Sequence, residues 1–112
     1  MQTLETIGWA RVLNDFTQRN GGRPTRMEVD DPRIGAQVQQ TDYRLFGVAY
    51  DPRDGSVEVM TGDYGTTDGH MTHTIRHVTD VWVLTDNGGR DEALCIAHDH
   101  GHGQTLLHLL WS

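Results

Sequence analysis

Residues 72–111 constrain the fold more than any other part of the chain, because β-forming segments alternate there with glycine-containing turns. The turn sequences are Asp86–Gly89 and Asp99–Gly103. Such sequences accept the positive backbone angles that hairpin turns require. The segments around them are rich in β-branched, aromatic or aliphatic residues, which favours strands. We therefore predict a meander of three antiparallel strands over Thr74–Thr85, Ala93–Ala97 and Leu106–Trp111.

The first third of the chain changes from a helical to a strand pattern. Trp9, Leu13 and Phe16 recur at three- and four-residue spacing, which predicts a helix over about residues 7–19 that ends at Gly21-Gly22. After Pro24 the apolar residues alternate with polar ones, a period typical of strands. Four further strands are predicted, at Thr25–Val29, Ile34–Gln39, Leu45–Tyr50 and Val57–Met60, with a loop over Thr61–His70.

These elements predict one α+β domain over residues 1–112. One N-terminal helix would pack on a strongly curved, mostly antiparallel sheet, or a small open β-barrel, of about six or seven strands between about residues 24 and 111. Both faces of the last strand are largely apolar, so that strand is either central in the sheet or covered by a second subunit. The second alternative predicts a homodimer.

Composition excludes several classes of function. The formal net charge is −7, and every one of the nine basic residues is an arginine. An acidic chain without a basic patch argues against nucleic acid as a partner. No apolar run approaches the roughly 20 residues that span a bilayer, and a basic, apolar leader is absent, so we expect a soluble cytoplasmic protein. The single cysteine, Cys95, lies in the middle of a strand and is expected in the core.

Histidines are concentrated in the meander. A hairpin centred on Asn87-Gly88 would place His77 opposite residues 98–99 and His73 opposite residues 102–103. Side chains that face each other across antiparallel strands have Cβ atoms about 5 Å apart. Three imidazoles at such distances can bind zinc or another late transition metal. The predicted ligands are His73, His77, His98, His100 and His102, and the alternative is that these histidines are turn and surface residues.

Taken together, the sequence features favour a small, non-enzymatic binding or accessory module that acts through protein–protein contacts with a second copy or another protein. We found no convergent catalytic set and no cofactor motif in the sequence. The expected contact surface is the Thr61–His73 loop with the last strand, and the expected interface residues are Trp82, Trp111 and Leu109. The alternatives are a histidine-cluster metal-binding protein or metal-dependent enzyme, and a barrel that binds a small ligand.

The order of landmarks resembles a family of short bacterial proteins known only as domain of unknown function 5335. The resemblance rests on the N-terminal helix with Trp9 and Phe16, on the segments Gly35–Val38, Leu45–Asp51 and His73–Ile75, and on the closing hairpin. It covers nearly the whole chain. It implies a small soluble domain and supplies no activity, cofactor or catalytic residue. The chain departs from the family pattern at His98, His100 and His102, where acids and ordinary turn residues are expected.

Overall fold

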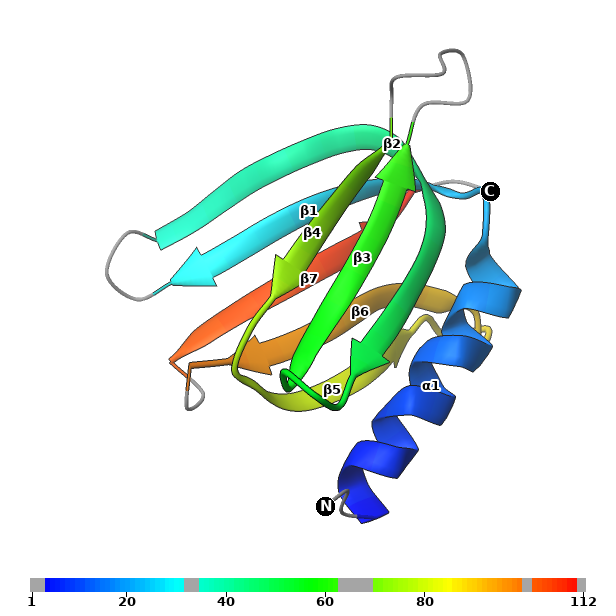
Figure 1. Cartoon of the computed structure of the whole chain (residues 1–112). Coiled ribbons are helices and arrows are strands. Elements are labelled where there is room, and N and C mark those ends of the chain that lie inside the picture. Colours follow the sequence, from blue (N-terminus) through cyan, green and yellow to red (C-terminus); the bar gives the residue numbers. More distant parts are fainter. Residues whose placement is uncertain (1–3, 32–34, 63–69, 100–101, 111–112) are drawn as a thin grey trace.

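The computed structural model describes residues 4–31, 35–62, 70–99 and 102–110, which form one α-helix and seven β-strands (Figure 1). The helix extends beyond the predicted range at both ends. In chain order the elements are α1 (Leu4–Asn20), β1 (Pro24–Asp31), β2 (Gly35–Asp51), β3 (Ser56–Gly62), β4 (Met71–Ile75), β5 (Val78–Thr85), β6 (Asp91–His98) and β7 (Gly103–Leu109).

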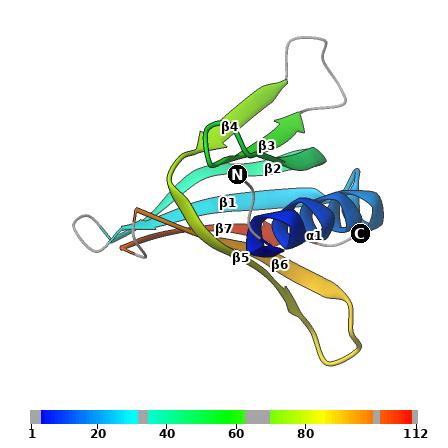
Figure 2. The same ribbon diagram turned by 60° about the horizontal axis from the view of Figure 1, so that its bottom comes forward.

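All described strands belong to one antiparallel sheet in the order β4-β3-β2-β1-β7-β6-β5. The sheet does not close into a barrel, since β4 pairs only with β3 and β5 pairs only with β6. It bends strongly, and α1 lies in the mouth of the bend, between the β2–β4 side and the β5–β6 side (Figure 2). The predicted helix on a curved, open antiparallel sheet is confirmed. No helix in the described part of the chain is long and apolar enough to cross a membrane.

The core lies between α1 and the concave face of the sheet. The predicted stripe supplies Trp9, Leu13 and Phe16, all buried, and the Trp9 ring meets that of Tyr50 edge to face at 5.5 Å. Alternate strand residues complete the core because successive side chains in a strand point to opposite faces. From the sheet these residues are Met27, Leu45, Val48, Val57, Val59, Ile75, Val81, Leu94, Ile96, Leu107 and Leu109.

One long strand replaces the two strands predicted at Ile34–Gln39 and Leu45–Tyr50. β2 is 17 residues long and changes neighbours near Arg44: its first part pairs with β1, its second with β3. Residues 35–38 are all exposed, so the alternation that predicts a strand there does not correspond to a buried face at these positions. The pairing with β1 runs from Gly35 to Arg44, and this continuous ladder joins the two predicted strands into one.

Conversely, the strand predicted at Thr74–Thr85 is two strands. His77 has a left-handed backbone angle (φ 56°), which ends β4 before β5 begins. This conformation is uncommon outside glycine, so no sequence signal marks it. The chain here crosses from one edge of the sheet to the other, since β4 and β5 are its two edge strands. The predicted first strand of the meander is therefore wrong in its extent, whereas the antiparallel pairing of β5 with β6 and of β6 with β7 is confirmed.

The position of β7 decides between the alternatives for the last strand. β7 lies between β1 and β6, in the middle of the sheet. Its apolar character follows from that central position and requires no second subunit. Cys95, on the neighbouring β6, is buried as expected, with 1 % of its surface exposed, and burial raises the pKa of its thiol.

Candidate functional site

The structure describes four of the five histidines predicted as metal ligands, all except His100, and it does not bring them into one ligand group. His73 lies in β4 opposite Val59, so its predicted position opposite residues 102–103 is wrong; the break after β4 removes that pairing. His77 does lie next to Asp99, whose amide donates to the His77 carbonyl at 3.0 Å. Both His77 and His102 are exposed, and His100 lies outside the described residues.

No three His, Cys, Asp or Glu side chains of the described segments form a group that could hold a metal ion. The zinc hypothesis thus stays a prediction, which metal analysis of untagged, dialysed protein would test. His108, on the outer face of β7, has a buried Nε2 that finds no hydrogen-bond partner among the described residues.

Among the predicted ligands that the structure describes, His98 is the buried one. Its Nδ1 lies 3.0 Å from Asp99 Oδ2 and its Nε2 lies 3.1 Å from Thr105 Oγ1. A hydroxyl, an imidazole and a carboxylate in this order resemble a nucleophile triad. Thr105 borders a depression of about 310 Å³ together with His98 and Asp99, but only 1 % of its surface is exposed, so its hydroxyl is nearly inaccessible to a substrate. We infer that these hydrogen bonds stabilise the β6–β7 hairpin.

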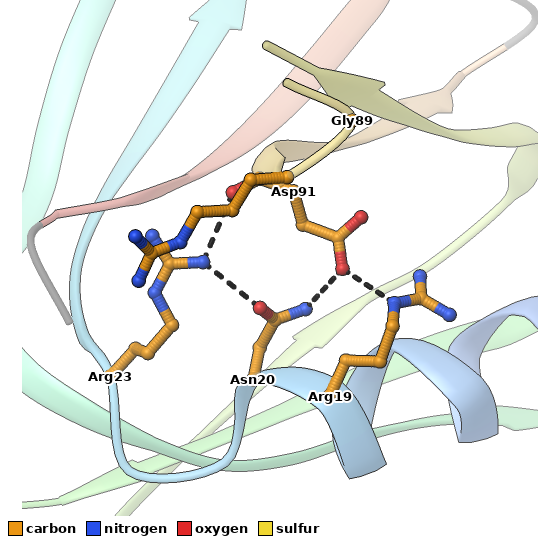
Figure 3. Close-up of a pocket in the computed structure, with 6 residues that line it drawn as sticks. Arg19, Asn20, Arg23, Gly89 and Asp91 are labelled. Carbon is orange, nitrogen blue, oxygen red and sulfur yellow. Dashed lines mark hydrogen bonds and ion pairs between the residues drawn. The ribbon is translucent and has the colours of Figure 1, made fainter.

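A pocket of about 260 Å³ lies where the end of α1 meets the β5–β6 turn (Figure 3). Arg19 and Asn20 come from the last turn of α1, and Arg23 follows just before β1. Arg90 and Asp91 come from the opposite side, at the turn and the first residue of β6. Residues far apart in the chain thus converge on one site.

Asp91 is the anionic centre of this pocket. Its Oδ2 accepts hydrogen bonds from Arg19 Nε and Asn20 Nδ2, both at 2.7 Å (Figure 3). Asp91 and Asn20 are buried, whereas the Arg19 side chain is half exposed. Burial alone would raise the pKa of Asp91, but the two hydrogen bonds and the charges of Arg19 and Arg23 outweigh it and lower that pKa.

Arg23 is held by neutral oxygens. One terminal nitrogen donates to Asn20 Oδ1 and to the Asp91 carbonyl, both at 3.0 Å, and the other donates to the Leu110 carbonyl at 2.9 Å. Its Nε is buried and has no partner among the described residues. Burial, followed by the nearby charge of Arg90, lowers the pKa of Arg23, while Asp91 and Asp86 act in the opposite direction. No carboxylate of the described residues touches this guanidinium.

A second depression, of about 390 Å³, adjoins the first and shares Arg19 with it. We call it the α1–β5 groove; Val12, Asp15, Arg19, Val81, Trp82 and Val83 line it. Successive side chains of a strand point to opposite faces, so three consecutive residues can line one groove only if the backbone edge of the strand borders it. The groove therefore runs along the free edge of β5.

The backbone of β5 confirms this orientation. The Val81 amide donates to the carboxylate of its own neighbour Asp80 at 2.8 Å instead of to another strand. Outward and inward backbone groups alternate along an antiparallel edge strand, so the amide and carbonyl of Val83 face the same free edge. The Asp80 carboxylate thus satisfies the edge-facing amide of Val81, whereas the next edge-facing amide, that of Val83, is available to a partner strand.

A family model described as "Family of unknown function (DUF5335)" matches residues 1–111. The chain belongs to this family. No curated protein and no solved structure matches the chain. The function of this DUF5335 member must accordingly be inferred from its own side chains.

The residues predicted as an interface are only partly on the surface of this DUF5335 domain. Trp82 is 36 % exposed and borders the α1–β5 groove. Leu109 is in the core, because it lies on the concave face of β7, and so adds nothing to a contact surface. Trp111 and residues 63–69 of the predicted contact loop lie outside the described residues.

The sequence interpretation missed the arginine pocket entirely. Neither Asn20 nor Asp91 was predicted as a site residue. The missed signal was small: an Arg-Asn-Gly-Gly-Arg segment carries two arginines across a helix end. Nothing local indicates that Asp91, some 70 residues later, bonds to that segment.

Proposed function

We propose that this DUF5335 chain is a non-enzymatic binding module that holds an extended segment of a partner protein in the α1–β5 groove. The free edge of β5 carries the proposal, because its open backbone groups border a partly apolar groove. An extended peptide can add a strand to such an edge, with main-chain hydrogen bonds for affinity and alternate side-chain contacts for specificity.

The side chains around the edge suit such a partner. Val12 and Val83 are half-buried and offer apolar contact inside the groove, while Trp82 and Leu84 are 36 % and 45 % exposed on the outer face of the same strand. A partly exposed tryptophan is a common energetic centre of protein interfaces. A second copy of the chain suits the groove less well, because two chains of net charge −7 repel each other.

Selection of peptides tests the proposal. A library of random eight-residue peptides with free carboxyl ends is selected against the wild type, Val83→Pro and Val83→Thr. Proline is tolerated on a strand edge but removes the amide that strand addition needs, whereas threonine keeps both amide and shape. We expect a shared peptide pattern for wild type and Val83→Thr, and a loss of affinity of about tenfold or more in Val83→Pro.

Two results would overturn the proposal. One is enrichment of the same peptides on Val83→Pro as on the wild type, with thermal unfolding showing that the variant is folded. The other is a concentration-dependent dimer of the wild type that Val83→Pro abolishes, which would assign the β5 edge to a second copy of the chain.

A further inference from the structure

We infer that the arginine pocket binds a carboxylate of the peptide segment that lies in the α1–β5 groove. This inference rests on the proposed function and names the chemical group that the groove selects. The pocket and the groove share Arg19, so an extended segment that runs along β5 towards its turn reaches the pocket.

The charge of the pocket carries the inference. Arg19, Arg23 and Arg90 line it together with one carboxylate, that of Asp91, so its lining has a formal charge of +2 in a chain of −7. Asp15 and Asp86 are close enough to act on Arg19 and Arg23, but neither lines the pocket. The pocket is therefore a local positive site on an acidic molecule.

Hydrogen-bond donors remain available there. Arg19 reaches Asp91 through Nε and uses neither terminal nitrogen in a bond within the described residues. The Arg90 side chain makes no hydrogen bond or ion pair with any described residue. Only its backbone is engaged: its amide donates to the Asp86 carboxylate, and its carbonyl accepts from the Asp86 amide. A planar guanidinium matches a carboxylate with two parallel hydrogen bonds. Two arginines thus have free donors beside a third whose position is fixed.

Arg23 supplies fixed charge without binding directly. Three neutral oxygens hold its terminal nitrogens, and burial, followed by the neighbouring Arg90, disfavours its charged form. An anion near Arg90 would relieve the repulsion between the two guanidinium groups. The pocket already binds one carboxylate of the protein itself, since Arg19 and Asn20 both donate to the side chain of Asp91.

The net charge of the chain selects a single carboxylate over a polyanion. A nucleic acid would bring many phosphates close to a surface of charge −7, whereas one carboxylate brings one charge to a site of +2. The carboxylate can belong to the carboxyl end of the peptide or to an aspartate or glutamate side chain. The chemistry is shared, and the test below separates the two sources.

The test uses nuclear magnetic resonance of the ¹⁵N-labelled full chain. The probes are an acetylated hexapeptide of alternating threonine and valine with a free carboxyl end, the same peptide with an amidated end, an amidated peptide ending in aspartate, and inorganic phosphate. The amides of Trp82 and Val83 report the groove. The amides of Gly89 and Arg90 and the side-chain amide of Asn20 report the pocket.

We expect both hexapeptides to shift the groove signals, and only carboxylate-bearing peptides to shift the pocket signals. Arg90→Gln should weaken binding of the free-acid peptide by about tenfold and leave the affinity for the amidated peptide unchanged. Arg11→Gln is the matched control, because it removes the same charge from an exposed residue of α1 that does not line the pocket. The terminal and aspartate peptides together identify which carboxylate is preferred.

Three results would overturn the inference. In the first, the free-acid and amidated hexapeptides shift the groove signals equally, bind with equal affinity and leave the pocket signals unchanged. This result would reject the inference but not the proposed function. Pocket shifts with phosphate but with neither carboxylate peptide would replace it by a phosphate site. If no peptide shifts the groove signals, the proposed function is rejected, and so is the inference that the pocket binds a carboxylate of the peptide.

Discussion

His98 occupies the space that a side chain at position 103 would need. A Cβ built on Gly103 would lie 2.5 Å from His98 Cε1 and 2.8 Å from Nδ1, so the ring must move in Gly103→Ala. That movement breaks its bonds to Asp99 and Thr105. We expect Gly103→Ala to lower the free energy of unfolding by roughly 1–3 kcal/mol, measured by urea denaturation.

The double variant Gly103→Ala/His98→Ala separates this clash from a general cost of alanine. With the ring removed, the Gly103→Ala change should cost much less, which a double-mutant cycle reports as coupling. Gly8→Ala is the matched control, because nothing lies within 4 Å of its Cβ position and alanine favours the helix. A cost of Gly103→Ala that persists unchanged without the ring would contradict this explanation.

Residue-level predictions from sequence succeed where one local pattern decides the environment. Trp9, Leu13 and Phe16 share a helical stripe, and all three are buried. The arginine pocket fails this condition, because Asn20 and Asp91 meet only through the packing of α1 against the β5–β6 turn. Leu109 shows the same limit: its apolarity was visible, but whether it faces core or partner depends on the position of β7 in the sheet.

At the scale of the element, Asp80 protects the free edge of β5. Its carboxylate accepts the outward amide of Val81, which would otherwise be open to another chain. We expect Asp80→Ala to self-associate more strongly than the wild type, as a rise in average mass with concentration in sedimentation velocity. Asp80→Asn removes the same charge but keeps an oxygen that can accept the amide, and it should behave as the wild type. Equal association of both variants would identify charge, and not the capped amide, as the protection.

The element boundaries that could not be predicted share one cause. The merging of two predicted strands into β2 depends on the ladder to β1, and the division between β4 and β5 depends on the left-handed turn at His77. The Asp99 amide and the carbonyl of His77 fix that turn through a long-range hydrogen bond. β7, whose burial alternates, was found, and the strand predicted at Ile34–Gln39 does lie largely in β2. What the sequence did not show is where strands join or divide, because pairing partners decide it.

At the scale of the whole molecule, an open sheet needs α1 to cover its core, and the Asp91 cluster ties the end of α1 to the strands. Asn20 links Asp91 to α1, and Arg23 links the start of β1 to the Asp91 carbonyl and to Leu110 after β7. Core packing along α1 and this polar cluster at its end thus hold the helix by two different kinds of force. The two respond differently to pH, because only the cluster contains an ionised group.

Acid should therefore loosen the molecule through Asp91. The pKa of this carboxyl is lowered in the folded protein, below the ordinary value near 3.9, so its contribution to stability is fully present above about pH 4 and is lost as the pH falls through the folded pKa.

We expect Asp91→Asn to lower the free energy of unfolding by roughly 1.5–3 kcal/mol at pH 7. Asparagine keeps an oxygen that can accept from Asn20, so the cost comes from the lost negative charge. Most of it arises at this buried bond, because the half-exposed Arg19 is screened by solvent. Urea denaturation of both proteins between pH 7 and pH 2 should show the difference shrinking below about pH 4. Asp51→Asn is the control. Arg53, in the turn that follows β2, lowers the pKa of Asp51 at the end of that strand, but the pair links no separate elements, and its loss should leave the curve close to that of the wild type. A constant difference between Asp91→Asn and the wild type down to pH 2 would show that the Asp91 charge does not hold α1 to the sheet.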